Sequence, residues 1–223
     1  MIPSHCHPSL PRRRLLSTLA AMAITTSALA ACGQRAPPLR MLTAGSTVLA
    51  LGDSLTSGVG APAADAYPAA LQALTGWQVV NGGVSGDTTA QALARLPALL
   101  QEHQPALVIV GIGGNDFLRQ LGAAAAKDNI RAICRTASAS GAQVLLVAVP
   151  QFSLLAVSTG RLADHPLYAQ LADELQLPLH AGGWAQVLSD ASLRSDAVHA
   201  NAQGYRQFAK GLAQQLRQAG WLG

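Results

Sequence analysis

A serine, an aspartate and a histidine in this sequence can together activate a nucleophile. Ser54 lies in the segment Gly-Asp-Ser-Leu, directly after a short apolar run. Near the carboxyl end, Asp196 and His199 are three residues apart. This spacing allows the carboxylate to hold Nδ1 of the imidazole while Nε2 faces a serine hydroxyl. These residue types and this spacing are compatible with nucleophilic catalysis by a serine, but the Ser54 segment taken alone is a weak signal for it.

Two competing interpretations of these residues are weaker. A glycine-rich phosphate-binding loop also follows a buried strand, but the Ser54 segment has no Gly-Lys-Ser/Thr ending and no lysine nearby. Three other histidines could act as the base. His103 ends a predicted helix, His165 precedes a proline in a polar loop, and His180 lies in a weak strand. We predict surface or core roles for all three.

Two glycine-rich segments follow other predicted strands. Residues 81–89 read Asn-Gly-Gly-Val-Ser-Gly-Asp-Thr-Thr, and Gly86 lets the backbone approach a ligand with its N–H unobstructed. Residues 111–116 read Gly-Ile-Gly-Gly-Asn-Asp, where the Asn115 amide can point back across the end of the sheet. Taken alone, each segment is explained equally well as a structural turn.

The elements that must position these residues alternate between strand and helix. Short apolar runs bounded by Gly, Pro or Asn are typical of strands buried on both faces; they cover residues 47–51, 77–80, 106–110, 144–149 and, more weakly, 178–180. The predicted helices cover about 66–74, 88–103, 124–140, 167–175 and 203–219. This order predicts an α/β fold, a three-layer α/β/α sandwich around a mainly parallel five-stranded sheet. Reactive groups then collect at the carboxyl ends of the strands.

In this order the four segments resemble the sequence blocks of the SGNH (GDSL) hydrolase family: Gly-Asp-Ser-Leu, a glycine in the second block, Gly-Gly-Asn-Asp, and Asp-x-x-His. The resemblance runs from about Thr47 to Gln218. Within the family, the resemblance is greatest to the bacterial subgroup of arylesterases and acyl-CoA thioesterase I/lysophospholipase L1. The further segments that carry it are Ser-Gly-Asp-Thr and Ala-Arg-Leu-Pro-Ala-Leu-Leu. It implies the flavodoxin-like SGNH hydrolase fold and a serine hydrolase that cleaves carboxylic esters, with thioesters and lysophospholipids as alternative substrates.

The resemblance also implies a role for each site residue. Ser54 would be the nucleophile, His199 the general base and later acid, and Asp196 the group that orients His199. The oxyanion hole would be formed by the backbone N–H groups of Ser54 and Gly86 and by the side-chain amide of Asn115. No metal and no organic cofactor is implied.

Two features depart from the family pattern. The proline that usually follows the histidine is Ala200 here, a change that removes no catalytic atom. Residues 151–166 do not match the thioesterase and lack a long aromatic-rich wall, so we expect short, unbranched acyl esters as the best substrates. Asp53 and Asp116, two acids beside the site, are predicted to be structural partners of their loops.

The amino-terminal residues resemble a bacterial lipoprotein signal. Three arginines precede a charge-free apolar stretch that ends in Leu-Ala-Ala-Cys, the arrangement of a lipobox. We predict a signal peptide over 1–31, a lipidated Cys32 with a flexible tether over 32–46, and the hydrolase domain over 47–223. The protein would face the periplasm from the cell envelope, and Gly33 favours the outer membrane. A plain secretory signal and a retained transmembrane anchor are the alternatives.

The net charge argues against nucleic-acid binding, and the number of cysteines argues against an intramolecular disulfide. The three leader arginines account for most of the formal net charge of +4, and their removal leaves about +1. Nucleic-acid binding is excluded because no basic cluster remains. Cys6 would leave with the leader and Cys32 would carry lipid, so Cys134 has no partner for an intramolecular disulfide and is predicted to lie in the helical core.

Two functional classes follow from these observations. The first is a monomeric hydrolase of small-molecule esters, held at a membrane by lipid on Cys32. The second is a surface-anchored binding module that kept the fold and lost the chemistry, which is disfavoured because Ser54, Asn115, Asp196 and His199 are all present. Carbohydrate O-acetyl esters are a further alternative substrate.

Overall fold

The computed structural model describes residues 40–152 and 159–222, which belong to one compact unit spanning residues 36–223. The predicted signal peptide, Cys32 and most of the predicted tether lie outside the described residues. Among the helices in the described ranges, none is both long and apolar enough to cross a membrane.

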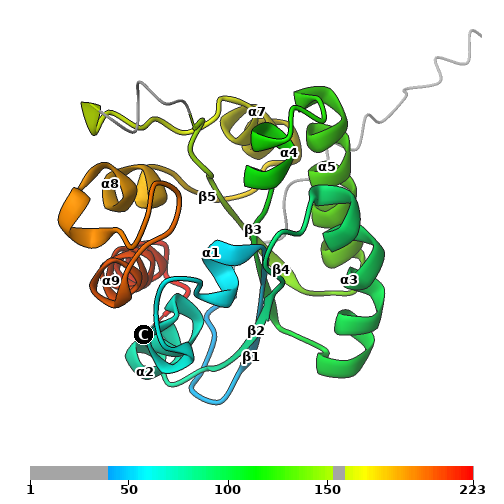
Figure 1. Ribbon diagram of the computed structural model, residues 1–223. Coiled ribbons are helices and arrows are strands. Elements are labelled where there is room, and N and C mark those ends of the chain that lie inside the picture. The colour runs from blue at the N-terminus through cyan, green and yellow to red at the C-terminus, as the bar shows by residue number, and fades with distance from the viewer. Residues whose placement is uncertain (1–39, 153–158, 223) are drawn as a thin grey trace, which may run out of the picture. The chain divides into compact units, whose positions relative to one another are not determined.

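The centre of the fold is a sheet of five parallel strands in the order β2-β1-β3-β4-β5 (Figure 1). Its strands are β1 Thr47–Gly52, β2 Gln78–Gly83, β3 Leu107–Gly111, β4 Gln143–Val147 and β5 Leu179–His180. β3 is buried throughout, and β1 is buried after its first residue. Each pair of consecutive strands is joined through at least one helix. This is the flavodoxin-like strand order, and it confirms the predicted α/β class.

Helices cover both faces of the sheet and complete the predicted three-layer sandwich (Figure 1). One face carries α3 Thr89–His103, α5 Ala123–Ala139 and α7 Leu167–Leu175. The other carries α2 Tyr67–Thr75, α8 Gly183–Ser189 and α9 Ala202–Gln218. The shorter elements are α1 Ser54–Ser57, α4 Gly114–Leu118, and the 3₁₀ turns Ala63–Asp65 and Ala191–Leu193. α8 was not predicted, since its two amino-terminal glycines are typical of a turn.

The strand β2 is longer at its carboxyl end than predicted. Asn81, Gly82 and Gly83 continue it, in register with Ala50, Leu51 and Gly52 of β1. The glycines are required by close packing: a Cβ on Gly83 would lie 2.2 Å from the backbone nitrogen of Ser57. Gly52 is also in register with Gly111 of β3. The ends of β2, β1 and β3 are therefore level, and the loops that follow them begin side by side.

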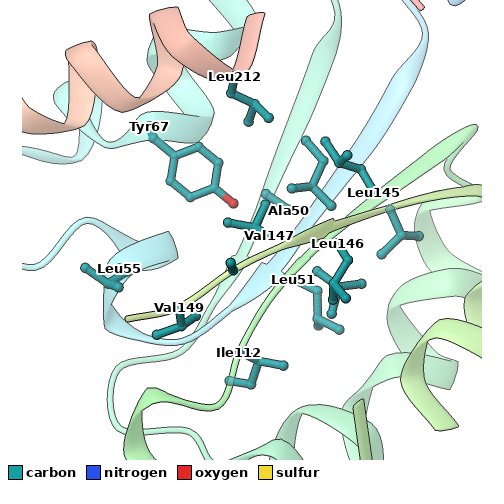
Figure 2. Close-up of a cluster of buried hydrophobic side chains, with 14 of the residues drawn as sticks. Ala50, Leu51, Leu55, Tyr67, Ile112, Leu145, Leu146, Val147, Val149 and Leu212 are labelled. Atoms are coloured by element: carbon teal, nitrogen blue, oxygen red, sulfur yellow. The ribbon is translucent and has the colours of Figure 1, made fainter. Parts of the chain in front are cut away.

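The core is apolar and continuous across the sheet. Figure 2 shows Tyr67 of α2 and Leu212 of α9 directed at the strands, in the same buried cluster as Ala50 and Val147. A stacked pair of Trp184 and Phe208, with ring centroids 3.7 Å apart, joins α8 to α9 on the same face. Cys134 is buried in α5, as predicted, and burial raises the pKa of its thiol to about 12. It is therefore a core residue and not a reactive one.

Candidate active site

Ser54 is presented at the carboxyl end of β1 by a very short helix. Asp53 is the N-cap of α1, and its Oδ1 accepts a hydrogen bond from the backbone nitrogen of Leu55 at 3.1 Å. Gly58 ends the helix in the left-handed conformation (φ +92°), and its N–H donates to the Ser54 carbonyl at 3.0 Å. The strand-to-helix turn thus places Ser54 at the carboxyl end of the central sheet.

The three residues singled out by type and spacing meet in one chain of hydrogen bonds. His199 Nε2 lies 2.8 Å from Ser54 Oγ, and His199 Nδ1 lies 2.7 Å from Asp196 Oδ2. An ionised carboxylate can only accept hydrogen bonds, so Nδ1 of His199 carries a proton and donates a hydrogen bond to Asp196. In the neutral ring Nε2 is then an acceptor, and the Ser54 hydroxyl donates to it.

The second oxygen of Asp196 holds the carboxylate in place. Oδ1 accepts hydrogen bonds from the backbone nitrogens of Val198 and His199, both at 2.8 Å. Burial raises the pKa of Asp196, but these hydrogen bonds and the one from the His199 ring outweigh burial, so the pKa lies below its ordinary value. The carboxylate is therefore ionised at neutral pH, and the exposure of 52% of its side chain to water also favours the charged form.

The loop that carries His199 is closed by its own hydrogen bonds. The backbone nitrogen of Ser195 donates to the His199 carbonyl at 3.0 Å, and Ser195 Oγ donates to the Ala200 carbonyl at 3.2 Å. Asn201 caps α9, and its side-chain amide donates to the Ser192 carbonyl at 2.8 Å. Ala200 is fully buried. These contacts order the loop although alanine replaces the usual proline.

The loops after β2 and β3, which carry Gly86 and Asn115, are joined by a hydrogen bond from Asn115 to the residue after Gly86. Gly86 has φ +84°, a conformation that favours glycine, and it is half-buried. Asn115 lies in the first turn of α4, and its Nδ2 donates to the Asp87 carbonyl at 3.0 Å. An amide nitrogen has two hydrogens, so one fixes the orientation of the side chain and the other stays available to a ligand.

The two neighbouring acids have structural partners, as predicted. Asp116 accepts from the backbone nitrogen of Thr89 at 2.8 Å and from its hydroxyl at 2.6 Å, which ties α4 to the start of α3. Asp53 caps α1. Burial is the main reason that the pKa of Asp53 is raised to about 6, and the hydrogen bond from the Leu55 N–H opposes this rise.

The other three histidines of the described residues lie in different surroundings. His103 ends α3, and His165 stacks on Phe117 with ring centroids 4.2 Å apart. His180 is buried in β5 with its Nδ1 paired to Gln215. Over residues 40–152 and 159–222, no group of three or more His, Cys, Asp or Glu side chains is placed to hold a metal ion.

Sequence reasoning gave no role to Arg95, although it lies in the Ala-Arg-Leu-Pro-Ala-Leu-Leu stretch that resembles the family. Its guanidinium bridges Asp87 and the carbonyl of Gly52, at 2.7 Å and 2.9 Å. The only available signal was a single arginine in an otherwise apolar stretch of helix, because the sequence did not indicate which loops it would reach.

The fold and the arrangement of this site define an SGNH-type hydrolase. The chain belongs to the GDSL-like lipase/acylhydrolase family, which matches residues 50–207, and it is a GDSL/SGNH esterase, as its family and relatives indicate. It is 37% identical to thioesterase 1/protease 1/lysophospholipase L1 of Escherichia coli over 182 residues, which cover 78% of this chain and 85% of that protein. It is 31% identical to an arylesterase of Vibrio mimicus over 183 residues, which cover 76% of this chain and 87% of the arylesterase. The crystal structure of TesA superposes with a TM-score of 0.68 at 29% identity, covering 78% of this chain and 99% of TesA.

Proposed function

We propose that the protein hydrolyses carboxylic esters through an acyl-enzyme formed on Ser54. The observation that carries this proposal is the continuous hydrogen-bond chain from Ser54 Oγ through His199 to Asp196, at 2.8 Å and 2.7 Å. A base in contact with a hydroxyl, itself oriented by an acid, is the arrangement that activates a serine nucleophile.

Two half-reactions follow from this arrangement. Ser54 Oγ bonds to the ester carbon while His199 Nε2 takes the hydroxyl proton and the carbonyl electron pair moves to oxygen. The tetrahedral intermediate then expels the alcohol, which takes the proton from Nε2. Water attacks the acyl-enzyme by the same steps, releasing the carboxylic acid and returning the proton to Ser54. Asp196 stays ionised and stabilises the imidazolium.

The negative oxygen of each tetrahedral intermediate would be bound by three donors: the backbone N–H groups of Ser54 and Gly86 and the Asn115 amide. Support comes from the level ends of β1, β2 and β3 and from the contact of Asn115 with Asp87. Donors held in place before the reaction need no reorganisation when the charge develops.

We propose small esters with short, unbranched acyl groups as substrates. Residues 151–166 contain a single aromatic residue, Phe152, and it lies 4.0 Å from the Cβ position of Gly114. The sequence of this segment therefore lacks the long aromatic-rich stretch that we would expect beside a binding site for long acyl chains. A panel of aryl and alkyl esters of rising chain length, with an acyl thioester, a lysophospholipid and an acetylated sugar, measures this preference. The highest kcat/KM on acyl groups of twelve or more carbons would contradict it.

The Ser54→Ala variant tests the reaction itself. We expect the wild-type protein to hydrolyse short esters and to react with a fluorophosphonate, in which Ser54 Oγ bonds to phosphorus and fluoride leaves. The variant should lose the labelling and at least about 10³-fold of kcat. Ser140→Ala, at the end of α5, is the matched control and should keep both. A wild-type protein that neither labels nor hydrolyses would instead be a binding module.

We propose that the protein is a periplasm-facing lipoprotein, anchored to the outer membrane by lipid on Cys32. The support is the sequence of the leader and its Leu-Ala-Ala-Cys ending. Cys32→Ala should abolish membrane association and leave the specific esterase activity unchanged, because lipid is the proposed anchor. Fractionation after a high-salt wash measures the effect, with Cys6→Ala as the control that stays in the membrane. A Cys32→Ala protein that still sediments with membranes would refute the anchor.

A further inference from the structure

The guanidinium of Arg95 joins two of the loops at the candidate site. Arg95 lies in the second turn of α3, with 23% of its side chain exposed. Its Nε donates to Asp87 Oδ2 at 2.7 Å, and its Nη2 donates to the Gly52 carbonyl at 2.9 Å. A guanidinium presents its donors in a rigid planar fork, so the two contacts fix the two acceptors relative to each other.

Each acceptor is next to a proposed oxyanion donor. Asp87 directly follows Gly86, and its carbonyl accepts the hydrogen bond from the Asn115 amide. Gly52 lies two residues before Ser54, and its carbonyl also accepts the backbone N–H of Val84 at 3.1 Å. Through these acceptors, one side chain is connected to the segments that carry all three donors.

Arg95 forms an ion pair with the Asp87 carboxylate. Only 9% of the Asp87 side chain is exposed, and a nearly buried carboxylate without a cation is strongly unfavourable. Removing the guanidinium would drive this carboxylate toward water and move the peptides on both sides of it. Those peptides carry the N–H of Gly86 and the carbonyl that orients Asn115.

We propose that Arg95 is a positioning residue that holds the oxyanion donors in their working geometry; this inference rests on the function proposed above. Oxyanion donors act mainly in the transition state, and small displacements of such groups slow a reaction strongly. Loss of Arg95 therefore lowers kcat and leaves KM almost unchanged.

The first measurement compares arginine variants. Arg95→Ala should lower kcat by about 10- to 100-fold with KM within about twofold of wild type. Arg95→Lys should recover part of the loss, because an ammonium can pair with Asp87 but cannot form the planar fork. Arg131→Ala is the matched control: Arg131 also has 23% of its side chain exposed and pairs with Glu174 and Asp128 in the helical layer. It should keep the wild-type kcat.

The second measurement asks whether Arg95 acts through the oxyanion hole. If it does, adding Arg95→Ala to an Asn115→Ala protein should cost much less than it costs the wild-type protein. A general effect on folding would instead multiply the two losses. Should Arg95→Ala fail to fold, Asp87→Asn, which keeps the size of the acceptor and removes its charge, carries the same test and the same expected fall in kcat.

The outcomes separate this inference from the proposed function. A folded Arg95→Ala protein with near-wild-type kcat, a rise in KM at constant kcat, or fully multiplicative losses with Asn115→Ala would each overturn the positioning role. In all three cases a loss of activity in Ser54→Ala would still support the proposed ester hydrolysis. If the wild-type protein hydrolyses no ester, or if Ser54→Ala remains active, the proposed function fails.

Discussion

Replacing Asp196 with asparagine is expected to lower kcat by about 10³- to 10⁴-fold near neutral pH. The variant keeps an oxygen that can accept from the backbone nitrogens of Val198 and His199, which in the wild type bond to Oδ1 at 2.8 Å. It loses the charge that, in the proposed mechanism, stabilises the imidazolium, and its amide group favours the tautomer of His199 with the proton on Nε2. That tautomer cannot take the proton of Ser54. Steady-state kinetics on a short aryl ester measure the effect.

Asp190→Asn is the control for this substitution. Asp190 lies six residues earlier and accepts from the backbone nitrogen and hydroxyl of Ser192 at 2.8 Å and 2.7 Å, away from the His199 ring. It should therefore keep near-wild-type kcat per folded molecule, with folding checked by circular dichroism. A folded Asp196→Asn enzyme with near-wild-type kcat would mean that Ser54 and His199 act as a dyad or that another acid orients the ring.

Replacing Asn115 with alanine is expected to lower kcat by about 10²- to 10³-fold with little change in KM. One hydrogen of the Asn115 amide donates to the Asp87 carbonyl at 3.0 Å, and the other is the proposed oxyanion donor. The substitution removes that donor and leaves the Ser54–His199–Asp196 chain intact. Separate determination of kcat and KM on the same ester gives the result.

Asn129→Ala is the matched control. The Asn129 amide donates to the hydroxyl of Thr89 at 3.0 Å, within the network that joins α3, α4 and α5. It makes a similar hydrogen bond with a structural purpose, so its loss should reduce stability more than turnover. If Asn115→Ala instead raises KM and keeps kcat, Asn115 binds the substrate and is not an oxyanion donor.

Long amphipathic and apolar segments were predictable from the sequence because their signals are local. The helix predicted over 88–103 is α3, which begins with a capping box between Thr88 and Gln91. The parallel class followed from the alternation of strand and helix. The short helices α1 and α4 were not predicted, since four or five residues show no helical period.

In the candidate site, too, local contacts could be predicted from the sequence, whereas long-range contacts could not. Asp196 and His199 are in one turn, so their spacing already allowed the contact seen at 2.7 Å. Resemblance to the family then indicated Ser54, Gly86 and Asn115 as their partners. The contact of Asn115 with Asp87 spans 28 residues, and it exists because β2, β1 and β3 end at the same level.

The amino-acid sequence by itself determined the class of fold, the order of its elements and the residue types at the site, because these depend on local pattern and on motifs in order. Only the tertiary structure decided that β2 continues through Asn81, Gly82 and Gly83, since β1 supplies the hydrogen bonds that a glycine-rich segment needs to stay extended. It alone also decided which groups the Arg95 side chain contacts. The partners of a long side chain are set by which loops the packed helices and strands bring within its reach.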